Sequence, residues 1–267
     1  MSDVSQEEKE VLQLKAGDFT GLADAYSKYR PGYSDLVVSA LIGSLGAPFS
    51  GARVADIGAG TGIFSRQLLD RNPASIVAVE PNEDMFEVGS AGSRPNLRWL
   101  LGSAESTGLE ASSIDLVTMA SSFHWPNTQQ ALREFDRVLA PKGVFAALWN
   151  PRITERSEVE SSIDRLLESE YGVSTRVSSG RSVFANELEE TLRESGLFGE
   201  VSYMHSLDVK RVKTSDYIGA WTSVNDIQSQ LGAERFREFI LQITEMLENV
   251  EDVDVHYLTR CWIAKKP

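Results

Sequence analysis

The residues with the clearest chemical potential lie in a glycine-rich stretch that follows a short apolar run. Gly58, Gly60 and Gly62 alternate with small residues directly after Arg53–Ile57. Glycine lets the backbone turn tightly and approach a ligand closely, and a helix that begins here presents unpaired N–H groups. Asp56, just before this turn, can orient it or accept a hydrogen bond from a ligand ammonium group. The pattern predicts a ligand site at the carboxyl end of a strand.

The spacing of these glycines distinguishes between nucleotide ligands. A dinucleotide fingerprint requires Gly-x-Gly-x-x-Gly. The third position is Ile63 when counted from Gly58 and Ser65 when counted from Gly60, so neither reading fits. Glycines at alternate positions after an acidic residue instead suit a nucleoside that carries an amino-acid tail.

A second acidic residue ends the next apolar run, residues 75–79. Glu80 is followed by Pro81 and stands 22 positions beyond Gly58. A carboxylate at the tip of a strand can accept hydrogen bonds from both hydroxyls of a ribose. We therefore expect Glu80 to position a nucleoside beside the glycine turn.

Two later segments complete the expected edge of the sheet. Residues 97–101 lead into 102–105, which would flank an adenine, and residues 114–119 lead into 121–125, which would face the reacting centre. His124 lies in the second segment, and an ordinary imidazole pKa suits proton abstraction from a hydroxyl or an amine. His124 is a candidate general base, or it is a structural residue that is hydrogen-bonded to the backbone.

The elements that must position these residues alternate between strand and helix. Apolar strands are predicted at 53–57, 75–79, 97–101, 114–119, 144–149, 201–209 and 253–265, and helices at 19–45 (interrupted at 31–32), 63–70, 81–88, 127–139, 154–170, 184–195, 215–224 and 234–250. This alternation predicts a doubly wound α/β fold with a mainly parallel sheet covered on both faces.

Composition narrows the class of protein. The 267 residues carry a net charge of −13, which disfavours a nucleic-acid partner because phosphates require basic residues. The chain has one cysteine, Cys261, so neither a disulfide framework nor a cysteine-rich metal site is expected, and no group of residues has metal-ligand spacing. It has no apolar run of about 18 residues and a polar beginning, so we expect a cytoplasmic protein that has no membrane partner.

With these residues in place, the chain resembles the class I S-adenosylmethionine-dependent methyltransferases. Segments 54–62, 77–82, 102–105 and 114–150 carry the resemblance. Within it, residues 122–125, 131–143, 148–150 and 26–33 are similar to the branch that includes trans-aconitate methyltransferase-like enzymes. The resemblance implies a seven-stranded sheet with an antiparallel last strand, a helical lid, S-adenosylmethionine as cofactor and S-adenosylhomocysteine as product.

The resemblance also implies roles for residues around the cofactor. Asp56, Gly58 and Gly60 would line the methionine moiety, Glu80 and Pro81 the ribose, Ser103, Ala104 and Glu105 the adenine, and Ser121 or Ser122 the sulfonium, while Tyr26, Tyr29 and Arg30 would close over the cofactor. Many relatives carry Asp where this chain has Ser103, so the adenine amine would lose a charged acceptor here.

Aromatic residues are the candidates for the acceptor side. Tyr26 is, with His124, a candidate catalytic residue. Cation–π contact with a sulfonium is possible for Tyr26, Phe123, Trp125 and Trp149. Phe19 is a further candidate for acceptor contact. Tyr217 and Trp221 share a predicted helix and either stack on the acceptor or pack in the core.

Three regions are expected along the chain. Residues 1–18 form an arm or helix that offers a means of self-association, residues 19–150 form the cofactor-binding core, and residues 151–267 complete the sheet and add lid insertions at 151–185 and 212–250. The predicted function is methyl transfer to O, N or C of a small molecule, with a natural-product intermediate favoured.

Three alternatives stay open. A small carboxylic acid as acceptor would call for arginines in the lid, for which Arg152, Arg176 and Arg181 are available. A nicotinamide-dependent oxidoreductase is disfavoured by the glycine spacing. A relative that catalyses rearrangement or cyclisation without methyl transfer would keep the same cofactor residues.

Overall fold

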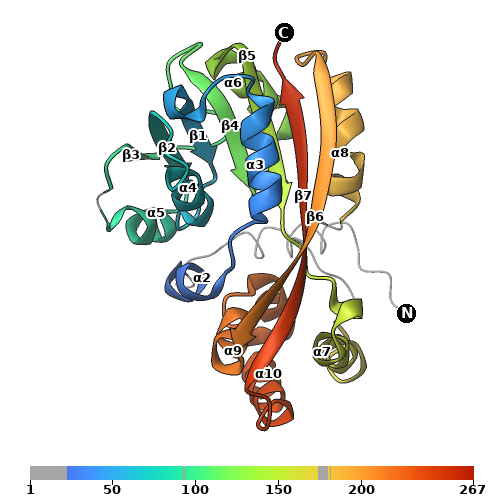
Figure 1. Ribbon diagram of the computed structural model, residues 1–267. Coiled ribbons are helices and arrows are strands. Elements are labelled where there is room, and N and C mark those ends of the chain that lie inside the picture. Colours follow the sequence, from blue (N-terminus) through green and yellow to red (C-terminus); the bar gives the residue numbers. More distant parts are fainter. Residues whose placement is uncertain (1–22, 93, 174–179, 181) are drawn as a thin grey trace.

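The computed structural model describes residues 23–92, 94–173, 180 and 182–267 (Figure 1). Within these residues, seven strands form one sheet in the order β3-β2-β1-β4-β5-β7-β6. The strands are β1 (Arg53–Ile57), β2 (Ser75–Glu80), β3 (Leu97–Leu101), β4 (Ile114–Ala120), β5 (Leu139–Trp149), β6 (Glu200–Lys213) and β7 (Asp252–Lys265). Only β7 runs antiparallel to its neighbours, β5 and β6, which confirms the predicted fold class.

The helices of the described residues follow the predicted alternation. They are α2 (Ala23–Tyr29), α3 (Asp35–Ser44), α4 (Ile63–Leu69), α5 (Glu83–Ser90), α6 (Thr128–Val138), α7 (Glu158–Ser169), α8 (Val183–Glu194), α9 (Thr214–Trp221) and α10 (Asn225–Met246), with short 3-10 turns at Phe49–Gly51 and Thr154–Arg156. Helix α6 shows why these segments fold: the Asn127 side chain caps its first turn, and Leu132 and Phe135 bury one face.

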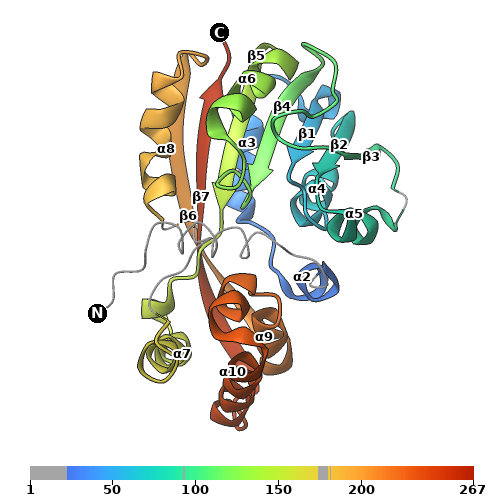
Figure 2. The same cartoon turned by 180° about the vertical axis from the view of Figure 1, so that it is seen from behind.

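Both faces of the sheet carry apolar side chains, and helices cover each face. Helices α3 and α4 cover one face, which Figure 1 shows in front, and α6 and α8 cover the other, which Figure 2 shows in front. In β1 the alternation is direct: Val54 joins the α3/α4 core and Ala55 joins the α6/α8 core. No described helix is both long and apolar enough to cross a membrane.

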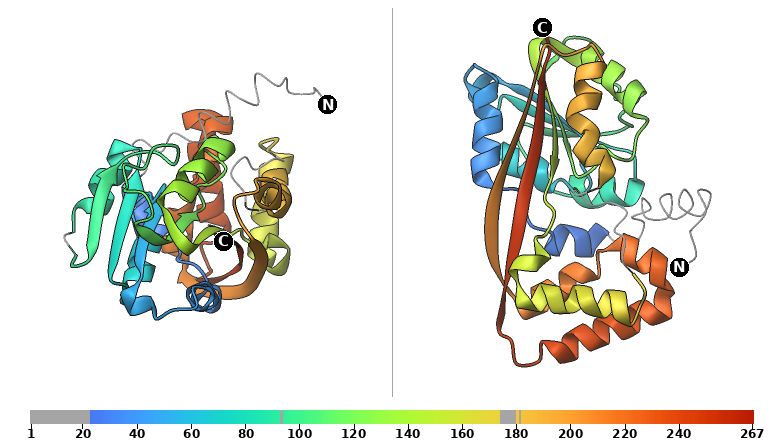
Figure 3. Two further views of the ribbon diagram at one scale, coloured as in Figure 1. Left: turned by 90° about the horizontal axis from the view of Figure 1, so that it is seen from above. Right: turned by 90° about the vertical axis from the view of Figure 1, so that its right-hand side faces the viewer.

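A third apolar core lies beyond the end of the sheet. The paired strands β6 and β7 extend past β5 as a long hairpin, and α7, α9 and α10 pack around its far end (Figures 1 and 3). Phe239, Ile243 and Trp221 are buried there. We refer to residues 154–173 and 206–259 as the lid.

Several boundaries differ from those predicted. Strand β5 begins at Leu139 rather than at 144. The predicted turn at 141–143 lies within the strand, at the point where the register between β4 and β5 shifts. Strand β6 continues to Lys213, since its pairing with β7 extends into the hairpin. Helix α10 begins at Asn225 rather than at 234, and it is broken at Gly232, whose φ is 73°.

Candidate active site

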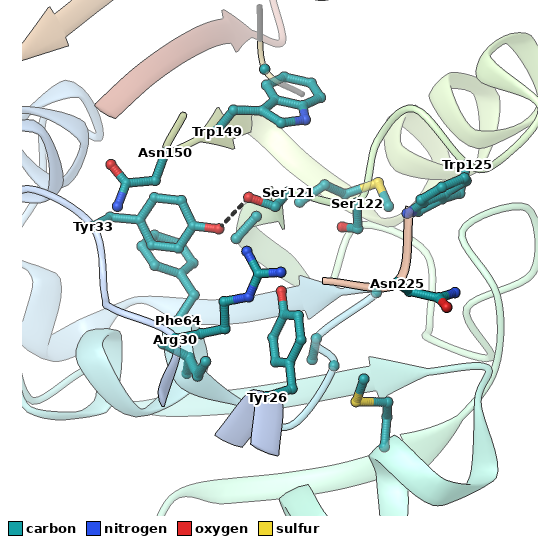
Figure 4. A pocket seen from close by; sticks show the side chains of 18 of the residues that line it. Tyr26, Arg30, Tyr33, Phe64, Ser121, Ser122, Trp125, Trp149, Asn150 and Asn225 are labelled. Carbon is teal, nitrogen blue, oxygen red and sulfur yellow. Dashed lines mark hydrogen bonds between the residues drawn. The ribbon is translucent and has the colours of Figure 1, made fainter. Parts of the chain in front are cut away.

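A cavity of about 540 Å³ opens at the carboxyl ends of the parallel strands and continues to the lid. Its size lies in the range of roughly 300–1,000 Å³ that is usual for small-molecule sites. Figure 4 shows side chains from α2, β5, the start of α10 and the segment that follows β4 around it. The cavity lies at the edge of the sheet where the glycine turn was expected to bind a ligand.

The three glycines of the turn have backbone φ angles that other residues rarely adopt. Gly58, Gly60 and Gly62 have φ of 63°, 57° and 81°. The N–H of Gly58 donates to the carbonyl of Val79 at 2.8 Å. A Cβ atom on Gly58 would lie 2.8 Å from the Ser122 hydroxyl oxygen. The first glycine is therefore required both by its φ and by the close approach of β4.

Asp56 lies behind this turn and does not line the cavity. Its two carboxylate oxygens accept hydrogen bonds from Ser65 Oγ at 2.6 Å and Thr118 Oγ1 at 2.8 Å, and the side chain is fully buried. Burial raises the pKa of Asp56 to about 6, although both hydroxyl donors oppose that rise. Asp56 joins β1, α4 and β4, so it orients the turn.

Glu80 lies at the cavity edge and holds the turn from the neighbouring strand. Its Oε2 accepts from the N–H of Gly60 at 2.7 Å, and its Oε1 accepts from the N–H of Asn82 at 2.9 Å. Burial raises the pKa of Glu80, while these two N–H groups lower it. Each carboxylate oxygen can accept more than one hydrogen bond, so the group remains able to accept from ribose hydroxyls.

The residues predicted to flank an adenine line the same cavity. Pro81, Ser103, Ala104 and Glu105 all line the cavity near Glu80. The Glu105 carboxylate accepts a hydrogen bond at 2.8 Å from the N–H of Asn127, the cap of α6.

Tyr33 lines the cavity as well, although no pattern in the sequence predicted it as a site residue. The Tyr33 hydroxyl lies 2.7 Å from Ser121 Oγ, and its ring packs edge-on against Phe64 with centroids 5.0 Å apart (Figure 4). Burial raises the pKa of Tyr33, so the hydroxyl stays protonated. Ser121 has φ of 60° and donates its N–H to Leu148 at 2.7 Å, which fixes its side chain at the end of β4.

Hydrogen bonds of Asn150 fix the backbone next to Tyr33. Asn150 Nδ2 donates to the carbonyl of Gly32 at 3.1 Å, and Asn150 Oδ1 accepts from Thr259 Oγ1 at 2.7 Å. Thr259 Oγ1 in turn accepts from the N–H of Ser34 at 2.9 Å. The ends of β5 and β7 therefore fix the segment between α2 and α3.

Some residues of α2 and of the position after it line the cavity, and others contact the lid. Tyr26 and Arg30 line the cavity, with the guanidinium 5.1 Å from the Tyr26 ring centroid (Figure 4). Arg30 also donates to Ser223, which follows α9. Tyr29 does not line the cavity, because its ring packs against Gly219 of α9.

The Phe-His-Trp segment after β4 turns mostly into the core. Trp125 and Trp149 line the cavity, whereas Phe123 is fully buried against Phe135 and Phe145. His124 does not line it either. Its Nδ1 accepts a hydrogen bond from Trp149 Nε1 at 3.3 Å.

Burial lowers the pKa of His124 to about 4, so the imidazole is neutral at neutral pH. In this geometry His124 supports Trp149 from behind. Its role as a general base remains a prediction, for which the structure offers no direct path to the cavity.

The lid end of the cavity contains Arg152, an arginine that is 16% exposed and lies among aromatic rings. Arg152 and Trp221 line the cavity, and the guanidinium lies 5.0 Å from the Trp221 ring and 5.1 Å from the Tyr217 ring. Glu160, whose side chain is 1% exposed, lies 3.7 Å from Arg152 Nε. Tyr217 is buried in the lid core and does not line the cavity.

Some predicted residues lie outside the described residues: Phe19, the arm at 1–18, Arg176 and Arg181. Among the residues that the structure describes, no group of three or more His, Cys, Asp or Glu side chains could hold a metal ion.

This sheet order defines a Rossmann-like α/β fold, and the glycine turn lies at the strand ends where such folds bind their ligands. Residues 55–147 match the family model described as a methyltransferase domain. Over this part of its length the chain is therefore similar to methyltransferases.

Individual proteins are similar to this chain over different shares of its length. An uncharacterized methyltransferase of Mycobacterium tuberculosis is 36% identical over 141 residues, which cover 53% of this chain and 54% of that protein, so the match spans about half of the relative's length. A candidate type II methyltransferase from Anaeromyxobacter dehalogenans shares the fold with a TM-score of 0.62 at 22% identity, covering 89% of this chain and 97% of that chain.

A third similar protein was solved with ligands. Phosphoethanolamine N-methyltransferase 2 from Haemonchus contortus, in complex with phosphomonomethylethanolamine and S-adenosylhomocysteine, has a TM-score of 0.55 at 16% identity. The match covers 97% of this chain and 60% of that chain. This likeness concerns the fold.

Proposed function

We propose that this protein transfers the methyl group of S-adenosylmethionine to a small-molecule acceptor in the cavity. One observation carries the proposal: Glu80 and the glycine turn meet at one end of a cavity whose other end is lined by Arg152 and Trp221 of the β5 end and the lid. A nucleoside at the first end leaves the second end for an acceptor.

The chain's own residues supply binding and alignment. Glu80 would accept from the ribose hydroxyls, Ser103 to Glu105 would flank the adenine, and Tyr26, Arg30, Ser121 and Ser122 would surround the methionine part. S-adenosylmethionine supplies an electrophilic methyl group on a sulfonium. The residues around it need mainly to hold the acceptor in line and exclude water, with Trp125 and Trp149 offering aromatic faces.

The rings at the lid end favour a flat, largely apolar acceptor such as a natural-product intermediate. Trp149, Trp221 and Tyr257 line that end and bury most of their surface. Aromatic walls bind such molecules with little conformational cost.

A small carboxylic acid is the second candidate acceptor, and Arg152 is the observation that favours it. Its guanidinium is supported by Glu160 from behind and by two rings at its faces, while the residue lines the cavity. An arginine held in this way can pair with a carboxylate in a planar, bidentate manner.

Transfer of labelled methyl from the cofactor to two acceptor panels separates these candidates. One panel holds neutral phenols, indoles and terpenoids, and the other holds mono-, di- and tricarboxylic acids. Arg152→Lys keeps the charge and loses the planar fork, so it should lower kcat/KM for an acid by about tenfold or more and leave a neutral acceptor within about threefold. Cofactor binding without label transfer to any acceptor would favour a non-methylating relative.

A further inference from the structure

Helix α2, on the cofactor side of the cavity, is joined directly to the lid. Two contacts make the joint, which we call the α2–α9 contact: Tyr29 against Gly219, and Arg30 with Ser223. Figure 3 shows α2 lying between the sheet and the lid helices.

The first contact requires a glycine in the lid. A Cβ atom on Gly219 would lie 2.6 Å from Cζ of Tyr29 and within 2.8 Å of two further ring carbons. Such distances do not occur between real side chains, so the ring occupies the space that any other residue would need. Gly219 lies inside helix α9 at an ordinary helical φ, where alanine would otherwise be favoured.

The second contact is a fork. Arg30 Nε donates to Ser223 Oγ at 3.0 Å, and Arg30 Nη2 donates to the carbonyl of Ser223 at 3.1 Å. Ser223 is fully buried, and its hydroxyl donates to the carbonyl of Ala220 at 2.8 Å. The guanidinium therefore donates hydrogen bonds to both the side chain and the backbone of Ser223, just after α9.

The residues immediately after this fork line the cavity. Val224, Asn225 and Asp226 follow Ser223 and form part of the wall at the lid end, and Trp221 precedes it. Arg30 itself lines the cavity beside Tyr26. One side chain thus contacts the space proposed for the cofactor and fixes the wall proposed for the acceptor.

We propose that Tyr29 and Arg30 are positioning residues that couple cofactor binding to the assembly of the acceptor wall at 224–226. The inference rests on the proposed function. A cofactor that orders α2 would, through the α2–α9 contact, order residues 214–231 as well. Acceptor would then bind better after the cofactor than before it, since coupling between two sites is reciprocal.

Hydrogen exchange with S-adenosylhomocysteine tests this without an acceptor. In the wild-type protein, saturating S-adenosylhomocysteine should slow amide exchange in residues 214–231 by about tenfold, within the roughly 5–150-fold typical of coupled sites. Arg30→Lys keeps a cation for the cofactor but loses the fork, and Ser223→Ala removes one partner of the fork. Both should reduce the protection of this segment to about threefold or less.

A pair of glycine variants controls for general loss of stability. Gly219→Ala places a methyl group into the Tyr29 ring and should abolish the ligand-dependent protection. Gly43→Ala, also within a helix, meets nothing within 4 Å and should behave as the wild type. Tyr29→Ala tests the contact without a clash, and it should lose the protection while its affinity for S-adenosylhomocysteine, measured by calorimetry, falls by tenfold or less.

Two results would overturn the coupling. In one, S-adenosylhomocysteine protects the glycine turn of the wild type but leaves residues 214–231 unchanged. In the other, Arg30→Lys, Ser223→Ala and Gly219→Ala keep full protection of that segment. A wild-type protein that does not bind S-adenosylhomocysteine in the calorimeter would instead refute the proposed function, and the coupling with it.

Discussion

The carboxylate of Glu80 accepts a hydrogen bond from the backbone N–H of Gly60 at 2.7 Å, so the tips of β2 and β1 are tied together at the cavity edge. The bond brings a strand-end acid and a glycine turn, 20 residues apart in the chain, into one site. It also shows that Glu80 has a structural partner in addition to any ligand.

The glycines of the turn should not be equivalent. A Cβ atom on Gly60 meets nothing within 4 Å, so Gly60→Ala should cost only the strain of a positive φ, about 1 kcal/mol in the free energy of unfolding. Gly58→Ala adds a clash with Ser122 at 2.8 Å and should cost at least twice as much and weaken S-adenosylhomocysteine binding more. Denaturant unfolding and calorimetry measure both effects.

The double variant Gly58→Ala/Ser122→Gly is the control for this clash. Removing the Ser122 side chain should recover part of the lost stability. Equal losses for Gly58→Ala and Gly60→Ala, with no recovery in the double variant, would show that β4 does not constrain the turn.

Tyr33 should matter through its hydroxyl. Tyr33→Phe keeps the ring against Phe64 and removes the bond to Ser121, leaving that hydroxyl without its partner at the end of β4. We expect a loss of about 1 kcal/mol in S-adenosylhomocysteine binding, near fivefold in affinity. Ser121→Ala should give a similar loss, and the double variant should lose little more than either single one, whereas strictly additive losses would mean that the two hydroxyls act independently.

Two groups, His124 and Asp56, should change the free energy of unfolding in opposite directions as the pH changes. The pKa of His124 is lowered to about 4 from about 6.5 in the unfolded chain, so this group costs stability as pH falls through that window. The pKa of Asp56 is raised to about 6 from about 3.9, so this group costs stability as pH rises through nearly the same window. Each contribution is on the order of 3 kcal/mol, and in the wild type they largely cancel.

Single substitutions should expose each of these contributions. His124→Asn leaves Asp56 and should make the protein relatively more stable at pH 4.5 than at pH 7, compared with the wild type. Asp56→Asn should shift the balance in the other direction. Urea unfolding at both pH values measures the difference, and identical pH dependence in all three proteins would contradict the assigned pKa shifts.

The same His124→Asn variant tests the general-base role. Loss of a general base typically costs about 10²–10⁴ in rate. His124 is neutral, does not line the cavity and accepts a hydrogen bond from Trp149, so we expect kcat with an identified acceptor to stay within about tenfold of the wild type. A loss of a hundredfold or more, with unchanged S-adenosylhomocysteine affinity, would restore His124 as a catalytic residue.

The parts of the site that the sequence predicts are those whose signal is local. Gly58, Gly60 and Glu80 follow from strand ends and turn chemistry, and the strand-helix alternation predicts the order of the elements. The roles of Tyr33 and Arg30 depend on partners 88 and 193 residues away, Ser121 and Ser223, so no local pattern reveals them.

Burial explains the remaining differences. A Phe-His-Trp run has no periodicity that would indicate which ring faces the cavity. In the fold Phe123 is buried, His124 does not line the cavity, and Trp125 does. The same holds for Tyr217 and Trp221: they share a helix, yet only Trp221 lines the cavity.

A crystal structure of the protein with bound S-adenosylhomocysteine would show where the nucleoside lies. We expect the ribose hydroxyls within hydrogen-bond distance of the Glu80 carboxylate, the adenine beside Ser103 to Glu105, and the sulfur facing Ser121 and the lid end of the cavity. A nucleoside bound elsewhere, or a ribose that does not contact Glu80, would contradict this expectation.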